Sequence, residues 1–317
     1  MSPNSWICLH PSNATQTTVS LDNRGLAYGD GFFTTMGVID GQILWLDYHQ
    51  QRLVSHAVAL QLQLDSFSLL TALKTHAKQL QQGMLKLIIT RAEQEVRGYG
   101  YTPNTGGGSA CEIWLKSSPM AITTARSLPL ADGQFIPLQP TASAICLSSQ
   151  IACLPPTLAG LKSLNRLDNV LASGELQAIK AKTLAGTIKP SIAEGLLRDM
   201  SGQWVEGTMS NVFYQLVEAP VAKSSNRPHS QNNSHSNYLT QCQWYMPSMA
   251  QSGVAGVMRQ VIIDTLSTSE NPVIIRSLQD EDLLHLSQLF FCNALRGIMP
   301  MSSLRLLSGE VVSFEAI

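Results

Sequence analysis

Short strand-like segments alternate with longer segments of helical periodicity in the first half of the chain, and this alternation limits the possible folds most strongly. Strands are predicted in GQILWL, which ends at Leu46, and in MLKLIITRA and CEIWLK, which a glycine-rich loop joins. Helices are predicted in DYHQQRLVSHAVALQ and SFSLLTALKTHAKQL, where apolar residues recur near helical spacing. The expected fold class is therefore a mixed α/β (α+β) fold.

A domain boundary is predicted near the middle of the chain. Periodicity is lost between about Ser117 and Gln134, where Ser, Thr, Pro and Gly accumulate. A chain of 317 residues is also long enough for two packed cores. We therefore predict an N-terminal α/β domain over residues 1–120, an interdomain linker over 121–134 and a C-terminal domain over 135–317.

The C-terminal half carries patterns for two helices and a hairpin. Apolar residues from Leu164 to Leu176 follow Lys162 at helical spacing, and GVMRQVIIDTL predicts a later helix with a glycine at its start. Between them, GLLRD and WVEG predict a hairpin that turns at Met200–Gln203 and leads into a strand, NVFYQLV. The polar segment 222–240 is too poor in aliphatic residues to offset its ordering entropy, so a mobile surface loop is predicted there.

Charge and composition exclude several classes of function. The formal net charge of -1 provides no basic field for nucleic acid or an anionic membrane, so a small-molecule or protein partner is expected. The chain lacks a long apolar run and a basic-then-apolar start, which favours a cytoplasmic protein. The six cysteines are scattered without metal-ligand spacing, which predicts reduced thiols and no metal site. His229 and His235 are more typical of polar filler than of metal ligands.

Three short stretches contain residue types that carry chemistry. Lys162, in GLKSLNRLDN, is by itself most typical of a solvated helix end with a buried stem. Glu206 lies on a predicted strand among apolar residues, where an unpaired carboxylate is costly, so it requires a cationic or protonated partner. Gly253 and Gly256, with Arg259 one turn into the next helix, are compatible with a phosphate at the helix start. Helix packing explains such glycines at least as often.

Six segments taken together resemble the fold-type IV family of pyridoxal-phosphate enzymes. They occur in the family's order and are RGLAYGDGFF, HQQRL, GLKSLNRLDNVLA, WVEGTMSNVF, GVAGVMRQ and FFCNAL. The resemblance, rather than any periodicity, implies pyridoxal 5′-phosphate as the cofactor. It also implies a smaller N-terminal α/β domain, a C-terminal domain with a β-barrel-like core, the cofactor at their junction and a homodimer whose partner subunit helps to line the site.

The resemblance assigns roles to individual residues. Lys162 is the implied Schiff-base residue and the general base at the substrate carbon. Glu206 matches the acid that pairs with the pyridinium nitrogen, and Arg166 is placed near the ring hydroxyl. The implied phosphate-binding residues are Arg52, the backbone amides of Val257 and Met258, and Asn293 with Ala294.

Within the family, the residues around the implied cofactor resemble those of aminodeoxychorismate lyases. Thr34 and Thr35 follow Phe33 where related aminotransferases usually carry a glutamate, and KSLNRLDNVLA, VRGYGY and CNAL are also lyase-like. The implied reaction converts 4-amino-4-deoxychorismate to 4-aminobenzoate and pyruvate, a step toward folate. A class IV aminotransferase acting on D-amino or branched-chain amino acids is the alternative, and a binding protein without activity is a third possibility.

Four residues are predicted to act on the substrate of such a lyase. Thr35 is the candidate to hydrogen-bond the leaving oxygen or relay a proton, with Thr34 beside it as a substrate-binding residue. Arg97, in RGYGY, is the first candidate to hold a substrate carboxylate. Gly37 stands where many relatives have an arginine, so Arg296 is a second candidate for that contact.

Overall fold

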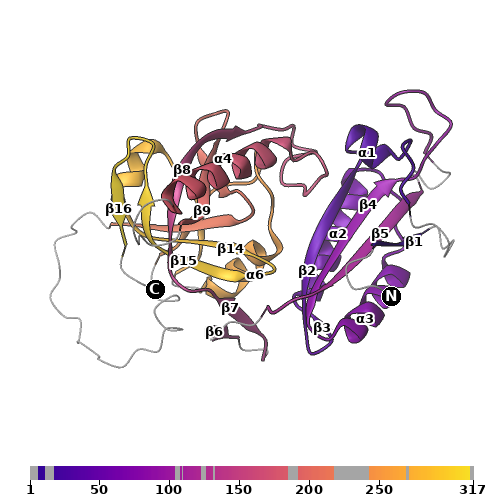
Figure 1. Ribbon diagram of the computed structural model, residues 1–317, viewed down its shortest axis with the longest axis horizontal. Helices are drawn as coiled ribbons and strands as arrows, with labels where there is room; N and C mark the ends of the chain where they lie inside the picture. The colour runs from indigo at the N-terminus through magenta and orange to yellow at the C-terminus, as the bar shows by residue number, and fades with distance from the viewer. Residues whose placement is uncertain are drawn as a thin grey trace. The chain divides into compact units, whose positions relative to one another are not determined.

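The computed structural model describes residues 6–10, 18–103, 108, 110–122, 126–130, 133–184, 192–217, 243–268 and 271–314. These residues form two compact units, drawn in Figure 1. Unit 1 comprises Met1–Thr123 with Leu161–Arg166, and unit 2 comprises Thr124–Gly160 with Leu167–Ile317. The predicted mobile loop at 222–240, with His229 and His235, lies outside the described residues.

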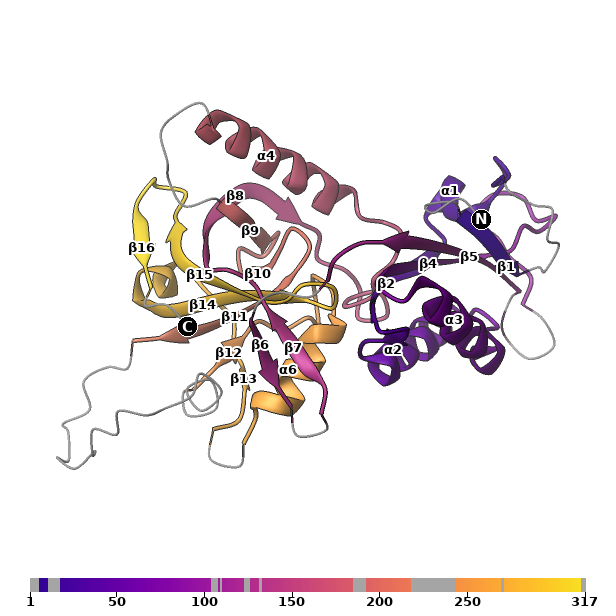
Figure 2. The same ribbon diagram turned by 60° about the horizontal axis from the view of Figure 1, so that its bottom comes forward.

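Unit 1 is an antiparallel sheet with helices against it. Its described strands follow the order β1-β5-β4-β2-β3. They are β1 (Trp6–His10), β2 (Gly31–Ile39), β3 (Gln42–Ile43), β4 (Gly83–Arg91) and β5 (Cys111–Pro119). Helices α2 (Leu46–Ala59) and α3 (Ser66–Leu80) cover one face of the sheet, as Figure 2 shows, and the short α1 (Arg24–Tyr28) contacts β4.

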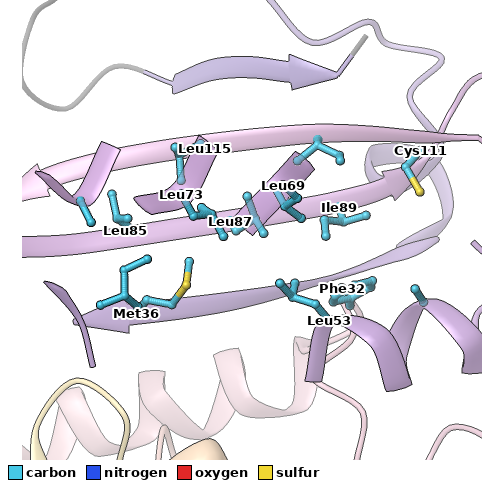
Figure 3. Packing of buried hydrophobic residues seen from close by; sticks show 14 of the residues in the cluster. Phe32, Met36, Leu53, Leu69, Leu73, Leu85, Leu87, Ile89, Cys111 and Leu115 are labelled. Atoms are coloured by element: carbon cyan, nitrogen blue, oxygen red, sulfur yellow. The ribbon is translucent and has the colours of Figure 1, made fainter. Parts of the chain in front are cut away.

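The core of unit 1 lies between that sheet face and the two helices. Figure 3 shows Phe32 of β2 beside Leu53 of α2, with Leu73 of α3 near Leu87 of β4. Side chains alternate along a strand, so the neighbours of Phe32 on β2 point to the opposite face of the sheet. The predicted helices are confirmed as α2 and α3, because their apolar faces coincide with this core.

The predicted strand over GQILWL is wrong beyond its first residues. Only Gln42–Ile43 pair as β3, after which Leu44 donates its N–H to the carbonyl of Gly37. Trp45 has a left-handed φ of 58° at the N-cap of α2 and turns the chain directly into that helix. Leu46 is therefore the first residue of a helix and not the last of a strand.

Unit 2 is built around a closed ring of strands. Strand β14 pairs with both β11 and β15, and the ladder β11-β10-β9-β8-β15 completes the circle. This closure accounts for a barrel-like core, in which Trp204, Phe291 and Met301 are buried. The ring consists of β8 (Ala142–Ile151), β9 (Ile192–Asp199), β10 (Trp204–Gly207), β11 (Asn211–Leu216), β14 (Leu286–Asn293) and β15 (Gly297–Arg305).

Further strands and helices surround the ring. Helix α4 (Leu167–Leu184) packs on β8 and β9 through Ala172 and Leu176, and helix α6 (Val257–Leu266) packs on β14 (Figure 2). The predicted hairpin is confirmed, since β9 and β10 pair antiparallel across the turn. The other elements are β6 (Arg126–Pro129), β7 (Phe135–Leu138), β12 (Tyr245–Met246), β13 (Ile274–Ile275), η1 (Asp280–His285) and β16 (Val311–Ser313). Among the described helices, none combines the length and apolar character needed to cross a membrane.

The structure contains a strand within the predicted linker, and one predicted helix begins later than expected. The division between the units falls inside the predicted linker 121–134, but that stretch also contains the strand β6. The helix predicted from Leu164 begins only at Leu167, because the preceding residues pair with β2 instead. Leu164 donates its N–H to Gly31, and Ser163 forms an isolated antiparallel bridge with Phe32.

Candidate active site

Lys162 lies in an extended segment along the edge of β2. Its carbonyl accepts the N–H of Phe33 at 3.0 Å, and its own N–H donates to His56 Nε2 at 2.9 Å. The side-chain Nζ lies 4.6 Å from the centroid of the Phe33 ring. The main chain of Lys162 is thus held on both sides, while the amine of this half-buried residue is directed toward an aromatic face.

Arg52 lies on α2, one turn before His56. The side chain is buried, and burial lowers the pKa of the guanidinium to about 10. It therefore keeps its charge at neutral pH. Burial strengthens the attraction between a guanidinium and an anion, so this position suits the binding of a phosphate or carboxylate.

The two threonines that follow Phe33 point to opposite faces of β2. Thr34 is fully buried on the core side, where its hydroxyl lies 2.8 Å from His49 Nδ1. The substrate-binding role predicted for Thr34 is therefore not supported, because strand alternation turns its side chain away from Phe33 and Lys162. Thr35 shares the face of Phe33 and pairs across the strands with Lys86.

Two further predicted arginines differ in their surroundings. Arg166 Nη2 donates to the carbonyl of Leu161 at 2.8 Å and to Ser163 Oγ at 3.3 Å, so it braces the segment that carries Lys162. Arg97 lies in the loop that follows β4 and is exposed. Its predicted contact with a substrate carboxylate stays a prediction.

His49, the buried histidine beside Thr34, is expected to make the fold less stable in acid. Burial, and secondarily the charge of Arg52, lowers the pKa of His49 to about 3, whereas an unfolded chain titrates histidine near 6.5. Below about pH 6.5 the unfolded state binds the proton first, so His49 makes the free energy of unfolding fall as the pH drops toward 3. Between pH 7.5 and pH 5, urea unfolding is expected to show a larger decrease in the free energy of unfolding for the wild type than for His49→Asn. Equal losses in the two proteins would contradict this assignment.

In unit 2, Glu206 lies on β10, and Val254 and Asn169 donate hydrogen bonds to its carboxylate. Its side chain is 3% exposed, and Oε2 accepts the N–H of Val254 at 2.8 Å. Oε1 accepts from Asn169 Nδ2 at 3.3 Å. These bonds orient the carboxylate, which as an acceptor suits a cationic or protonated ring nitrogen.

The start of α6 is close to Glu206 in unit 2. Its N-cap is Gly256 and no side chain caps it, so the amides of Val257 and Met258 project from the helix end without an intrahelical acceptor. A Cβ at Gly256 would lie 2.0 Å from Asn211 Oδ1, so this close approach requires glycine. Asn211 Nδ2 in turn donates to the carbonyl of Val254, which fixes the segment that also binds Glu206. An uncapped helix start of this kind suits a phosphate.

Asn293 is the last residue of β14, and Ala294 begins the turn that leads to β15. Asn293 Oδ1 accepts the N–H groups of Leu295 and Arg296, so this side chain stabilises the turn. Asn293 Nδ2 donates to the carbonyl of Met209 at 3.4 Å, so a phosphate contact from Asn293 would come from its backbone N–H. Asn293 follows Cys292, which pairs with Asn211 across the sheet.

The structure therefore groups the predicted residues into two sets. Unit 1 brings Lys162, Arg166 and Thr35 to β2 and Arg52 to α2, while unit 2 brings Glu206, Val257 and Met258 together. Sequence reasoning missed Asn169, Asn211 and His56, which hold these residues in place. A polar signal existed for Asn211, which comes directly before the apolar residues Val212 and Phe213 of β11, but the partners of His56 and Asn169 are distant in sequence.

The chain matches known proteins over most of its length. Residues 31–304 match the family model of class IV amino-transferases. Aminodeoxychorismate lyase of Vibrio harveyi is 24% identical over 291 residues, which cover 91% of this chain and 88% of that protein. A putative branched-chain-amino-acid aminotransferase of Methanocaldococcus jannaschii is 26% identical over 303 residues, which cover 94% of this chain and 86% of that protein.

A solved structure shows the same architecture. The crystal structure of 4-amino-4-deoxychorismate lyase from Pseudomonas aeruginosa matches with a TM-score of 0.67 and 28% identity, over 94% of this chain and 90% of that chain. The expected combination of an α/β unit and a barrel-like unit is confirmed. The chain belongs to the class IV aminotransferase family, which has the fold-type IV architecture and uses pyridoxal 5′-phosphate as its cofactor.

Proposed function

We propose that this protein is a 4-amino-4-deoxychorismate lyase that forms 4-aminobenzoate and pyruvate in folate biosynthesis. The observation that carries the proposal is the face of β2 next to Lys162, where Phe33 lies 4.6 Å from the amine and Thr35 is on the same face. Related aminotransferases usually carry a glutamate after the aromatic pair. Two relatives named as such lyases, at 24% and 28% identity, support the same choice.

Residues of both units fit pyridoxal phosphate. The buried cation of Arg52 and the amides at the uncapped start of α6 suit its phosphate, with the backbone of Asn293 and Ala294 as the proposed remainder of the cradle. Glu206, oriented by Asn169 and by the N–H of Val254, suits its ring nitrogen. We propose that both sets serve one cofactor molecule. Along the chain, Lys162 comes two residues after Gly160. The carbonyl of Gly160 accepts the N–H of Ala255, which lies at the entry to α6.

The bound cofactor supplies an electron sink, and the chain supplies the proton transfers. Lys162 is the proposed base that removes the proton from the amine-bearing carbon of the substrate. The C–O bond to the enolpyruvyl group then breaks, the ring becomes aromatic, and the released enolpyruvate takes up one proton to become pyruvate. Thr35 is the proposed group that hydrogen-bonds or protonates the leaving oxygen. The atoms balance without water or a second substrate, and the amino group stays on the product.

The proposal also assigns residues to the carboxylates of the substrate and to the ring hydroxyl of the cofactor. Arg97 is the first candidate for a substrate carboxylate, with Arg296 as the second because Gly37 offers no side chain. Arg166 is proposed to contact the ring hydroxyl from the segment that it braces. Substitution of either candidate arginine is expected to raise KM more than it lowers kcat, because carboxylate binding is shared by the ground state and the transition state.

The deciding experiment is an assay of the purified, cofactor-loaded protein with 4-amino-4-deoxychorismate. We expect equimolar 4-aminobenzoate and pyruvate, and no requirement for a keto acid. Incubation with D-amino or branched-chain amino acids tests the aminotransferase alternative, which a relative at 26% identity favours. Conversion of the cofactor to its amino form with these amino acids, together with no 4-aminobenzoate from the first substrate, would overturn the lyase proposal.

A homodimer in the cytoplasm is also proposed. Helix α4 exposes Leu167, Val170 and Leu171, at 78%, 61% and 70%, on one helical face. An apolar face of this kind is typical of a protein interface, and the family resemblance implies a second copy of the chain. Cys111, Cys146 and Cys292 are buried without a disulfide, which is compatible with a reducing compartment.

A further inference from the structure

A chain of hydrogen bonds connects the main chain of Lys162 to the main chain of Arg52. Lys162 donates its N–H to His56 Nε2 at 2.9 Å, and His56 Nδ1 lies 3.3 Å from Ser55 Oγ. Ser55 Oγ in turn donates to the carbonyl of Arg52 at 3.2 Å. The chain therefore joins the segment of Lys162 to α2, the helix that carries Arg52.

The donors and acceptors in this chain have only one consistent direction. A backbone N–H can only donate, so Nε2 of His56 must be the unprotonated nitrogen. A neutral imidazole then carries its proton on Nδ1, which donates to Ser55 Oγ. The hydroxyl proton of Ser55 is left to bond the carbonyl of Arg52. His56 and Ser55 each act once as a donor and once as an acceptor along the chain.

The ring of His56 is fixed in a place where it stays neutral. Its side chain is 5% exposed and meets the ring of Phe32 edge to face, with the centroids 5.3 Å apart. Burial, together with the charges of Arg52, Lys162 and Arg166, lowers the pKa of His56 to about 3. Nε2 therefore remains an acceptor throughout the neutral pH range.

We propose that His56 is a positioning residue, which holds the main chain of Lys162 against α2 and thereby fixes the reactive amine relative to Arg52. Main-chain bonds of this segment also run to Gly31 and Phe33 of β2, and Arg166 donates to the carbonyl of Leu161. His56 supplies an acceptor from a different element, helix α2. This inference rests on the proposed role of Lys162, and it requires the acceptor atom of His56 rather than its size or its ring.

Substitutions of His56 distinguish the effect of its acceptor atom from the effect of its side-chain volume. In His56→Gln, the amide oxygen can take the place of Nε2, whereas His56→Asn is shorter by one methylene and cannot reach Lys162. His56→Leu keeps much of the volume but has no acceptor. The matched control is His76→Leu, which removes a part-buried histidine from α3 of the same unit.

Two measurements test the proposal. Amide hydrogen exchange at Lys162 is expected to be faster in His56→Asn and His56→Leu, by roughly fivefold to tenfold, the effect of losing one hydrogen bond. In the cofactor-loaded enzymes, kcat is expected to fall about tenfold or more with a smaller change in KM, because a displaced reactive group slows the chemical step. His56→Gln and His76→Leu should stay close to the wild type in both measurements.

Several results would overturn the inference. One is a rate of amide hydrogen exchange at Lys162 in folded His56→Asn that equals the wild-type rate. Another is a faster exchange rate in a variant whose kcat is unchanged. A third is a His56→Gln variant as impaired as His56→Asn, since shape rather than the acceptor would then matter. Failure of the proposed function is distinguishable, because it appears as absence of 4-aminobenzoate from the wild type, whereas exchange at Lys162 is measured without any substrate.

Discussion

Lys162→Ala is expected to lower kcat by about 10⁴-fold or more, a larger loss than any other single substitution in this protein should cause. The residue would supply both the amine that attaches the cofactor and the base that moves the substrate proton. The Lys162 segment is fixed by bonds to β2 and His56, so its amine is held in a defined position that a side chain from another element is not expected to take over. The fold should survive, since those bonds come from the main chain.

The control for this substitution is Lys86→Ala. Lys86 Nζ lies 5.4 Å from the same Phe33 ring, on the neighbouring strand β4, so it is a second amine in the same surroundings. Borohydride treatment of the cofactor-loaded wild type and Lys86→Ala proteins is expected to fix the label on the peptide that contains Lys162. Labelling at that peptide in Lys162→Ala, or label on Lys86 in the wild type, would refute the assignment.

The features that could be predicted from the sequence have local causes. The helices α2 and α3 follow from apolar periodicity, and the β9–β10 hairpin follows from a turn between two apolar runs. The errors arose where a single residue or a distant partner decides the conformation. Trp45 ends the predicted strand by its left-handed φ, and β2 holds Leu164 in an extended segment although its spacing suits a helix.

The candidate site shows the same limit. Lys162, Glu206 and Arg52 could be named because short motifs surround them. The residues that orient them could not, since Asn169 reaches Glu206 and His56 reaches Lys162 from sequence separations of 37 and 106. The sequence could not show which of Thr34 and Thr35 faces the core. Only the alternation of side chains along β2 shows that Thr34 does.

Glu206→Gln is expected to lower kcat by about 10²- to 10³-fold while the cofactor still binds. The substitution removes a charge and little volume. Its oxygen can accept the N–H of Val254, and its amide can donate to Asn169 if that side-chain amide turns over. What would be lost is the anion that is proposed to keep the ring nitrogen protonated. Electron withdrawal by the cofactor then weakens, so the deficit should appear in kcat rather than in KM.

The matched control is Glu194→Gln on the adjacent strand β9. Glu194 is as buried as Glu206, at 3% exposure, but its carboxylate accepts from Thr208 and Ser210 rather than serving a cofactor. Its substitution should lower the free energy of unfolding and leave kcat near the wild-type value. If both variants lost activity in proportion to stability, burial alone would explain the effect. A kcat deficit confined to Glu206→Gln, in a protein of wild-type stability, identifies the charge of Glu206 as the catalytic requirement.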